Sequence, residues 1–254
     1  MEYSVCLPAV FGGISIPDAI RRVSALGFCA YEFWSWWDQD VDAILEAQEA
    51  TGLRPRGLCT RFVSLTAPGE RDAYIAGLRK SLQIAKRLRC PTLISQVGQA
   101  IAGVPREEQH RSIVEGLKMC APMLEDAGVT LAVEPLNTLV DHRGYYLERS
   151  DEAFEIIREV GSPNVRVLFD IYHQQITEGN LIANLTKNID MIAHVHIAGN
   201  PGRHEPLIDS EVHYPTVIGA LRSCGYDGAV GLEYFPLRDP EEGLRDILLR
   251  MSID

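Results

Sequence analysis

Short runs rich in β-branched and aromatic residues alternate eight times with longer stretches of helical periodicity along this chain of 254 residues. Capping residues, prolines and glycines separate the runs, as Ser15, Gly27, Gly52 and Pro105 illustrate. Eight strand–helix units in about 250 residues is the size of a closed parallel barrel. An open doubly wound sheet usually has fewer units and a glycine-rich first turn, whereas the first turn here reads GGIS. We therefore expect an α/β fold, a single (β/α)8 TIM barrel over residues 1–254.

The expected elements fill the whole chain. Strands are expected at residues 3–7, 28–33, 54–59, 92–96, 130–134, 165–170, 194–197 and 229–233. Helices are expected at residues 15–27, 41–50, 71–87, 105–128, 151–160, 181–189, 215–223 and 240–251. No low-complexity tract, charged tail or linker indicates a second domain.

Acidic side chains outnumber basic ones, with 35 Asp and Glu against 24 Lys and Arg and a net charge of −11. This balance repels phosphate backbones and anionic membrane surfaces, so we expect neither a nucleic acid nor a membrane as partner. The chain has no apolar run of about 18 residues, and its first residues lack the sections of a signal peptide. The six cysteines are widely spaced without a CxxC pair, which is typical of reduced thiols. We expect a cytoplasmic protein.

Four consecutive strands of the expected barrel end in side chains that commonly bind metals. Glu134 closes the sequence AVE, Asp170 closes VLFD, His196 lies in HVHI, and Glu233 closes VGLE. The carboxyl ends of barrel strands converge on one mouth, and the active site of such a barrel lies there. Neighbouring strands should therefore bring these four side chains within reach of one ion.

Three carboxylates and one imidazole form an oxygen-rich set suited to Mn²⁺, Mg²⁺ or Co²⁺. A single acid at a strand end more often caps the next helix or pairs with a basic residue. Three carboxylates crowded together without a cation, however, would repel one another and take up protons. The set of four therefore predicts a divalent metal as cofactor.

Further polar side chains follow the same strand ends and are interpreted as contacts to a small-molecule substrate. Asn137 lies in EPLN, His173 in DIYHQQ, and Arg203 and Glu205 in PGRHEP. His173, expected in the loop after the sixth strand, is suited to bond a substrate hydroxyl or a ligand carboxylate, although a capping or solvent-facing role explains it equally well. The planar donor fork of Arg203 is suited to a carboxylate or a pair of hydroxyls, although an ordinary surface salt bridge explains it equally well.

Two further groups of side chains are expected to be structural or to shape the pocket. His194 is interpreted as a structural residue that faces the surrounding helices. The three tryptophans after the second strand are interpreted as a wall of the pocket, although packing at the rim explains them equally well: Trp34, Trp36 and Trp37.

Taken together, these motifs resemble the hydroxypyruvate isomerase-like group of the xylose isomerase-like barrel superfamily, which also contains ketose 3-epimerases, inosose-processing enzymes and endonuclease IV. The resemblance covers nearly the whole chain. It rests on EPLN, GYYL, FDIYHQQ, HVHIAGNPGRHEP, the pair of Glu211 and Tyr214, and GYDGAVGLEYFP, in the expected order. In one respect the chain departs from the isomerases, which usually carry glutamine where this chain has His196, as the epimerase and inosose branches do.

The resemblance implies a metal-dependent isomerase of a small sugar or hydroxy-keto acid, whose metal ligands are Glu134, Asp170, His196 and Glu233. It also implies that Glu134 and Glu233 exchange protons with the substrate and that His173 and Arg203 contact it. The metal would bind the carbonyl and the neighbouring hydroxyl of a hydroxy-ketone or hydroxy-aldehyde, and the reaction would pass through an enediolate. Barrels of this group are often dimers or tetramers, so a homo-oligomer is implied as well.

Other functions remain open on the same barrel. Return of the proton to the opposite face of the same carbon would make the protein a ketose 3-epimerase. Expulsion of a neighbouring hydroxyl would make it a dehydratase of an inosose or dehydroshikimate type. A noncatalytic sugar-binding module is a third alternative. An apurinic endonuclease is disfavoured, because the chain is acidic and has only seven histidines.

Overall fold

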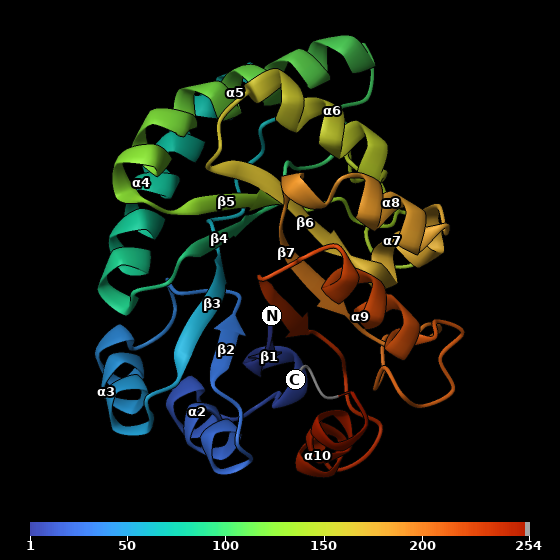
Figure 1. Ribbon diagram of the computed structural model, residues 1–254. Coiled ribbons are helices and arrows are strands. Elements are labelled where there is room, and N and C mark those ends of the chain that lie inside the picture. The colour runs from blue at the N-terminus through green and yellow to red at the C-terminus, as the bar shows by residue number, and fades with distance from the viewer. Residues whose placement is uncertain (252–254) are drawn as a thin grey trace.

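The computed structural model describes residues 1–251 and shows a closed barrel whose strands are hydrogen-bonded in sequence order, β1 to β8 (Figure 1). All neighbouring strands, including β1 and β8, run parallel. The strands are β1 (Glu2–Cys6), β2 (Ala30–Phe33), β3 (Arg54–Cys59), β4 (Thr92–Ser95), β5 (Thr130–Val133), β6 (Val165–Asp170), β7 (Ile192–Ile197) and β8 (Ala229–Leu232). The predicted (β/α)8 barrel is confirmed.

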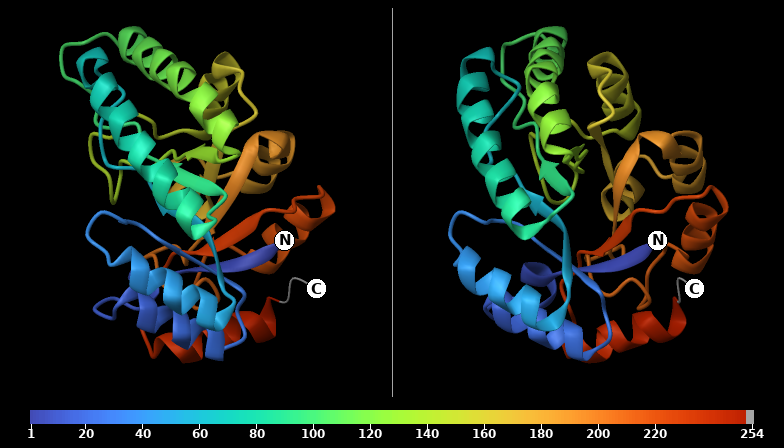
Figure 2. Two further views of the ribbon diagram at one scale, coloured as in Figure 1. Left: turned by 90° about the vertical axis from the view of Figure 1, so that its left-hand side faces the viewer. Right: turned by 60° about the vertical axis from the view of Figure 1, so that its left-hand side comes forward.

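Helices form the layer outside the strands, and the long helices α4 and α5 lie side by side in it (Figure 2). The helices are α1 (Leu7–Val10), α2 (Ile16–Ala25), α3 (Val41–Thr51), α4 (Arg71–Leu88), α5 (Arg106–Ala127), α6 (Ser150–Val160), α7 (Ile171–Thr177), α8 (Leu181–Lys187), α9 (Tyr214–Ser223) and α10 (Pro240–Arg250). Two 3-10 turns precede α4 and β7: η1 (Pro68–Glu70) and η2 (Ile189–Met191).

The predicted caps define several helix ends. The Ser15 hydroxyl accepts a hydrogen bond from the Asp18 amide at 3.3 Å and so begins α2. Gly52 and Gly128, with φ of 75° and 63°, adopt the left-handed conformation that ends α3 and α5. These local signals explain why the helix boundaries can be read from the sequence.

Two short helices differ from the expectation, and one of them changes the setting of a predicted site residue. A helix, α1, begins directly after β1, where a loop is expected. A second, α7, begins directly after β6, so His173 lies on a helix and not in a loop. The cause is Asp170, whose Oδ1 accepts hydrogen bonds from the amides of Tyr172 at 2.8 Å and His173 at 3.2 Å.

Most of the apolar core lies in a continuous cluster that includes the outward-facing residues of the strands and the inner faces of the helices. A second, smaller cluster lies inside the barrel lumen, because its members alternate along their strands with outward-facing residues. It consists of Cys59, Ile94, Ala132 and Leu168. No helix among residues 1–251 is long and apolar enough to cross a membrane.

Candidate functional site

The four predicted metal ligands meet at the carboxyl ends of β5, β6, β7 and β8. Glu134 and Glu233 lie one residue beyond their strands, yet their amides still bond the neighbouring strands, at Ser95 (3.0 Å) and Ile197 (3.2 Å). One ligand atom from each of the four residues lies within 4.8 Å of the others, and all four residues are buried. The sequence-based expectation that these side chains converge is confirmed.

His196 lies among the three carboxylates. Its Nδ1 is 3.2 Å from Glu233 Oε2, 3.7 Å from Glu134 Oε1 and 4.0 Å from Asp170 Oδ2. Ligands bound at about 2.1 Å to one octahedral cation lie about 3 to 4 Å from one another, so these separations suit a common ion. Both His196 Nδ1 and Glu134 Oε1 are buried without a hydrogen-bond partner among residues 1–251. Unpartnered buried polar atoms are costly, and a shared cation would satisfy both.

The charges around His196 lead to the same conclusion. Burial lowers the pKa of His196, but Glu233, Glu32 and Glu134 outweigh burial and raise it well above its ordinary value. The pocket therefore holds an excess of negative charge that needs a positive partner. Either a proton or a divalent cation on Nδ1 would balance this negative charge. The four residues are therefore suited to bind a metal.

Glu233 is held by donors on both oxygens. Trp34 Nε1 donates to Oε1 at 2.6 Å, and Arg203 Nη2 donates to Oε2 at 2.5 Å. Burial raises the pKa of this carboxyl, but Arg203 and His196 outweigh burial and hold the pKa well below its usual range. Glu233 is therefore a firmly positioned, ionised carboxylate.

Asp170 combines two roles that the sequence presents as alternatives. Its Oδ1 caps α7, while its Oδ2 faces Arg203 Nη2 at 3.5 Å and His196. Burial raises the pKa of Asp170 and prevails over the opposing effects of Arg203 and His196. The capping interpretation thus holds for one oxygen, and the other stays directed at the cluster.

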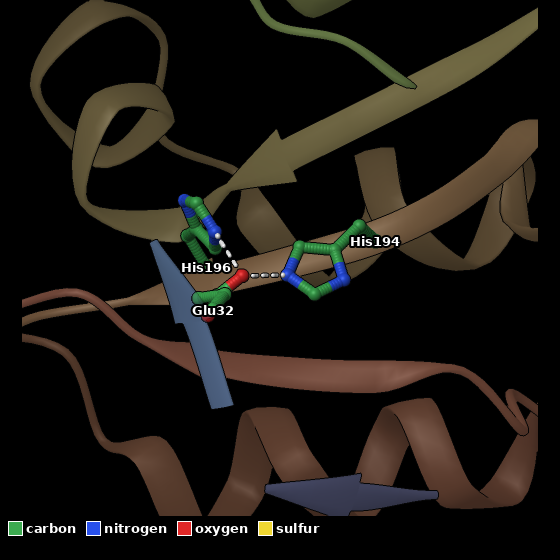
Figure 3. A group of neighbouring side chains, drawn as sticks. All are labelled: Glu32, His194 and His196. Carbon is green, nitrogen blue, oxygen red and sulfur yellow. Dashed lines mark hydrogen bonds and ion pairs between the residues drawn. The ribbon is translucent and has the colours of Figure 1, made fainter. Parts of the chain in front are cut away.

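A buried glutamate that the sequence analysis did not single out supports His196 from below. Oε2 of Glu32, on β2, accepts hydrogen bonds from Nε2 of His194 at 2.8 Å and of His196 at 3.3 Å (Figure 3). Because a carboxylate only accepts, both imidazoles carry hydrogen on Nε2, which directs His196 Nδ1 at the cluster. Burial opposes ionisation of Glu32, but the two histidines outweigh it and lower its pKa to about 2.

This arrangement shows that the expected orientation of His194 is wrong. His194 lies inside the barrel beside His196, with the two rings 4.9 Å apart, and does not face the helices. Residues two positions apart on a strand share a face, so His194 must point the same way as His196. In the sequence, Glu32 is marked only as an acidic residue alone among apolar ones in AYEF. Its partner His194 is 162 residues away, so no local pattern indicates their contact.

Two glycines make room for the group of Glu32, His194 and His196. A Cβ atom on Gly231 would lie 2.1 Å from Glu32 Oε1 and 2.5 Å from His196 Cδ2. A Cβ on Gly57 would lie 3.0 Å from Glu32 Oε2. Small residues at these places on β8 and β3 are therefore required by the polar side chains inside the barrel.

A cavity of about 750 Å³ opens above the cluster. Glu134, His196 and Glu233 lie on its wall, and most of the remaining lining is apolar. Trp34 lines the cavity as predicted, whereas Trp36 bonds Ser81 Oγ at 3.2 Å and Trp37 packs edge-on against Phe62. A cavity of this size and shape suits a small molecule.

The four predicted substrate contacts fall into two pairs. His173 and Arg203 line the cavity. Asn137 lies behind His173, with its Nδ2 2.6 Å from His173 Nδ1, and Glu205 accepts hydrogen bonds from the Leu237 amide at 3.2 and 3.1 Å. Burial, helped by Arg203, lowers the pKa of His173 to about 3, so its ring is neutral. Its Nε2 is buried without a hydrogen-bond partner within residues 1–251.

Comparison with known proteins places this geometry in a family. The family model of the xylose isomerase-like TIM barrel matches residues 20–251. The chain belongs to this family. The hydroxypyruvate isomerase of Escherichia coli K12 is 30% identical over 96% of this chain and 97% of its own length. The 2-oxo-tetronate isomerase of Cupriavidus necator is 32% identical over 96% of each chain.

A solved structure extends the likeness to three dimensions. The structure titled AP endonuclease, family 2, from Brucella melitensis matches with a TM-score of 0.93 and 29% identity, over 98% of this chain and 99% of that one. The family, its fold and the arrangement of the four residues in the site are thus consistent with one another.

Proposed function

We propose that this chain is a metal-dependent isomerase that moves a proton between neighbouring carbons of a small hydroxy-ketone or hydroxy-aldehyde. The observation that carries the proposal is the convergence of Glu134, Asp170, His196 and Glu233. Two atoms that face the cluster, His196 Nδ1 and Glu134 Oε1, are buried without a hydrogen-bond partner among residues 1–251. The isomerase names of the two relatives, which span nearly the whole chain, support it.

The four residues would hold Mn²⁺, Mg²⁺ or Co²⁺, since they are oxygen-rich and contain no thiolate. Such a cation would supply a Lewis acid that polarises the carbonyl and hydroxyl oxygens of the substrate.

Glu134, whose Oε2 accepts a hydrogen bond from Gln96 Nε2 at 3.2 Å, would take up the substrate proton. Glu233, at the end of β8 and fixed by Trp34 and Arg203, would exchange a proton with the substrate as well. His173, through Nε2, and Arg203, through its unpartnered Nε, would bond substrate oxygens. Asn137 would orient the His173 ring, and Glu205 would hold the segment before α10.

The same pair of glutamates also supports ketose 3-epimerase activity as a second candidate. The observation that favours it is His196, which stands where the isomerase group usually has glutamine. If Glu134 takes a proton from one face of a carbon and Glu233 returns one to the other face, the product is an epimer.

A small molecule is proposed as the substrate in preference to nucleic acid. A net charge of −11 disfavours the phosphate contacts that an apurinic endonuclease needs. The six free cysteines support a proposed cytoplasmic location, and the homo-oligomer implied by the family stays a prediction that light scattering would test.

The proposal is tested by NMR in D₂O with protein stripped of metal and reloaded with Mg²⁺, Mn²⁺ or Co²⁺. Hydroxypyruvate, tetruloses, pentuloses, hexuloses and inososes form the panel. We expect deuterium incorporation only in the reloaded protein, with a new isomer or epimer as product. Loss of water would indicate a dehydratase, and binding without exchange would indicate a sugar-binding protein; either result would overturn the isomerase.

A further inference from the structure

The cavity above the four ligands carries little positive charge. Among its lining residues in the described part of the chain, Arg203 is the single Lys or Arg side chain. Three carboxylates line the same cavity, those of Glu70, Glu134 and Glu233. A substrate that enters this cavity therefore meets more acidic than basic groups.

The charge of Arg203 is already balanced. Its Nη2 bonds Glu233 Oε2 at 2.5 Å and lies 3.5 Å from Asp170 Oδ2. The guanidinium also packs between the rings of Tyr172, at 5.2 Å, and Phe235, at 5.9 Å. Arg203 therefore cannot use Nη2 in a pair of parallel hydrogen bonds to a substrate carboxylate. Single donors remain, such as Nε, which has no partner among residues 1–251.

A bound divalent cation would bring the net charge of these groups to zero and no higher. Glu134, Asp170 and Glu233 together contribute three negative charges, which the two charges of the cation and the one of Arg203 would cancel. No surplus positive charge would remain to pair with a carboxylate on the substrate. A buried carboxylate without such a partner is costly.

Apart from the donors of Arg203 and the neutral His173, the walls of the cavity offer an anion little compensation. Apolar side chains form much of them, including Phe62, Ile94, Ile101, Leu136 and Phe235. Such surfaces exclude water and cannot solvate a carboxylate, whereas they tolerate the carbon chain of an uncharged molecule.

We propose that the substrate is an uncharged hydroxy-ketone or hydroxy-aldehyde and that the corresponding keto-acids are poor substrates. This inference rests on the proposed isomerase function and narrows it. It separates this chain from the two curated relatives, which are named for hydroxypyruvate and 2-oxo-tetronate, both carboxylates.

Two matched substrate pairs test the inference on the unmodified, metal-loaded protein. Dihydroxyacetone and hydroxypyruvate share three carbons and differ in one terminal group, CH₂OH against COO⁻. Erythrulose and 2-oxo-tetronate form the same comparison with four carbons. Initial rates of deuterium incorporation, corrected for exchange without protein, give kcat/KM for each. We expect the uncharged member to be preferred by about tenfold or more, the cost of one unpaired charged group.

The possible results separate the inference from the function on which it rests. Equal rates, or a preference for the acids, would overturn the inference and leave the isomerase standing. Exchange with no member of either pair and with none of the pentuloses, hexuloses and inososes, under conditions where the metal binds by calorimetry, would overturn the isomerase and the inference with it.

A charge added to the wall provides an independent readout. Phe235 is 44% exposed, lines the cavity and lies beside Arg203. Phe235→Lys should raise kcat/KM for 2-oxo-tetronate relative to erythrulose by about tenfold, the effect of one charge-assisted hydrogen bond. Phe235→Leu, the control, should leave that ratio unchanged. If the lysine does not change the ratio while circular dichroism shows the fold intact, the missing positive charge is not what decides the substrate.

Discussion

The two sides of the barrel lumen hold opposite kinds of side chain. On β3 to β6 the lumen is filled by the apolar group of Cys59, Ile94, Ala132 and Leu168. On β2 and β7 it holds the charged group of Glu32, His194 and His196. The apolar side contributes stability by burial, whereas the charged side carries a desolvation cost. The charged side is therefore explained by its support of the His196 ring and not by a contribution to the stability of the fold.

Removal of a large apolar side chain from the lumen should cause the largest loss of stability. Leu168 is fully buried, so Leu168→Ala should lower the free energy of unfolding by about 2–5 kcal/mol. Its effect on metal affinity should be small by comparison. Urea unfolding and calorimetric metal titration measure the two quantities. A large loss of metal affinity with little loss of stability would show that the apolar side of the lumen does not serve mainly to stabilise the fold.

Charge removal at the mouth should show the reverse pattern. Glu134→Gln or Glu233→Gln should leave a folded protein and reduce turnover by at least about 100-fold, as expected for general acid–base catalysis. Single-turnover exchange in D₂O and thermal unfolding test this together. Near-normal turnover in either variant would refute its role in proton exchange.

Glu32→Gln tests the charged side of the lumen, because His196 is the one predicted metal ligand that bonds Glu32 in the described part of the chain. Loss of the carboxylate should release the His196 ring and weaken binding of Mn²⁺ by about 10- to 100-fold, as other supporting residues of metal ligands do. The control is Glu205→Gln, which removes another buried acid whose carboxylate bonds the Leu237 amide. Calorimetry should show weaker binding only for the first variant. Equal affinities would mean that Glu32 does not position His196.

Gly231→Ala should disturb the same group by steric overlap. A Cβ there would lie 2.1 Å from Glu32 Oε1, so we expect a loss of about 1–3 kcal/mol in stability. Gly219→Ala, on α9, is the matched control, since an added Cβ there would have no neighbour within 4 Å and alanine favours a helix. The two should shift the thermal midpoint in opposite directions. A tolerated alanine at position 231 would show that the lumen has more room than the structure indicates.

Among the variants compared by kinetics, Arg203→Ala should have the smallest effect. Loss of one charge-assisted hydrogen bond should raise KM for an uncharged substrate by about tenfold. Steady-state kinetics in saturating metal measure it. An unchanged KM would place Arg203 outside the substrate contacts and leave it as a partner of Glu233 and Asp170 alone.

The sequence predicted the elements better than the contacts between them. The eight strands, the caps at Ser15, Gly52 and Gly128, and the four residues at the mouth all follow from local signals. The helix α7 does not, because in the sequence a cap and a metal ligand are alternative roles for Asp170, whereas in the structure each role uses one of its two oxygens.

The repeat of strand and helix and the position of ligand-type side chains at strand ends follow from the amino-acid sequence, because periodicity and capping act within a few residues. The support that Glu32 gives to His194 and His196, and the pairing of Arg203 with Glu233 and Asp170, follow from the folded barrel. Barrel closure brings residues from distant strands into one lumen, and their mutual charges and distances exist only once that closure is made.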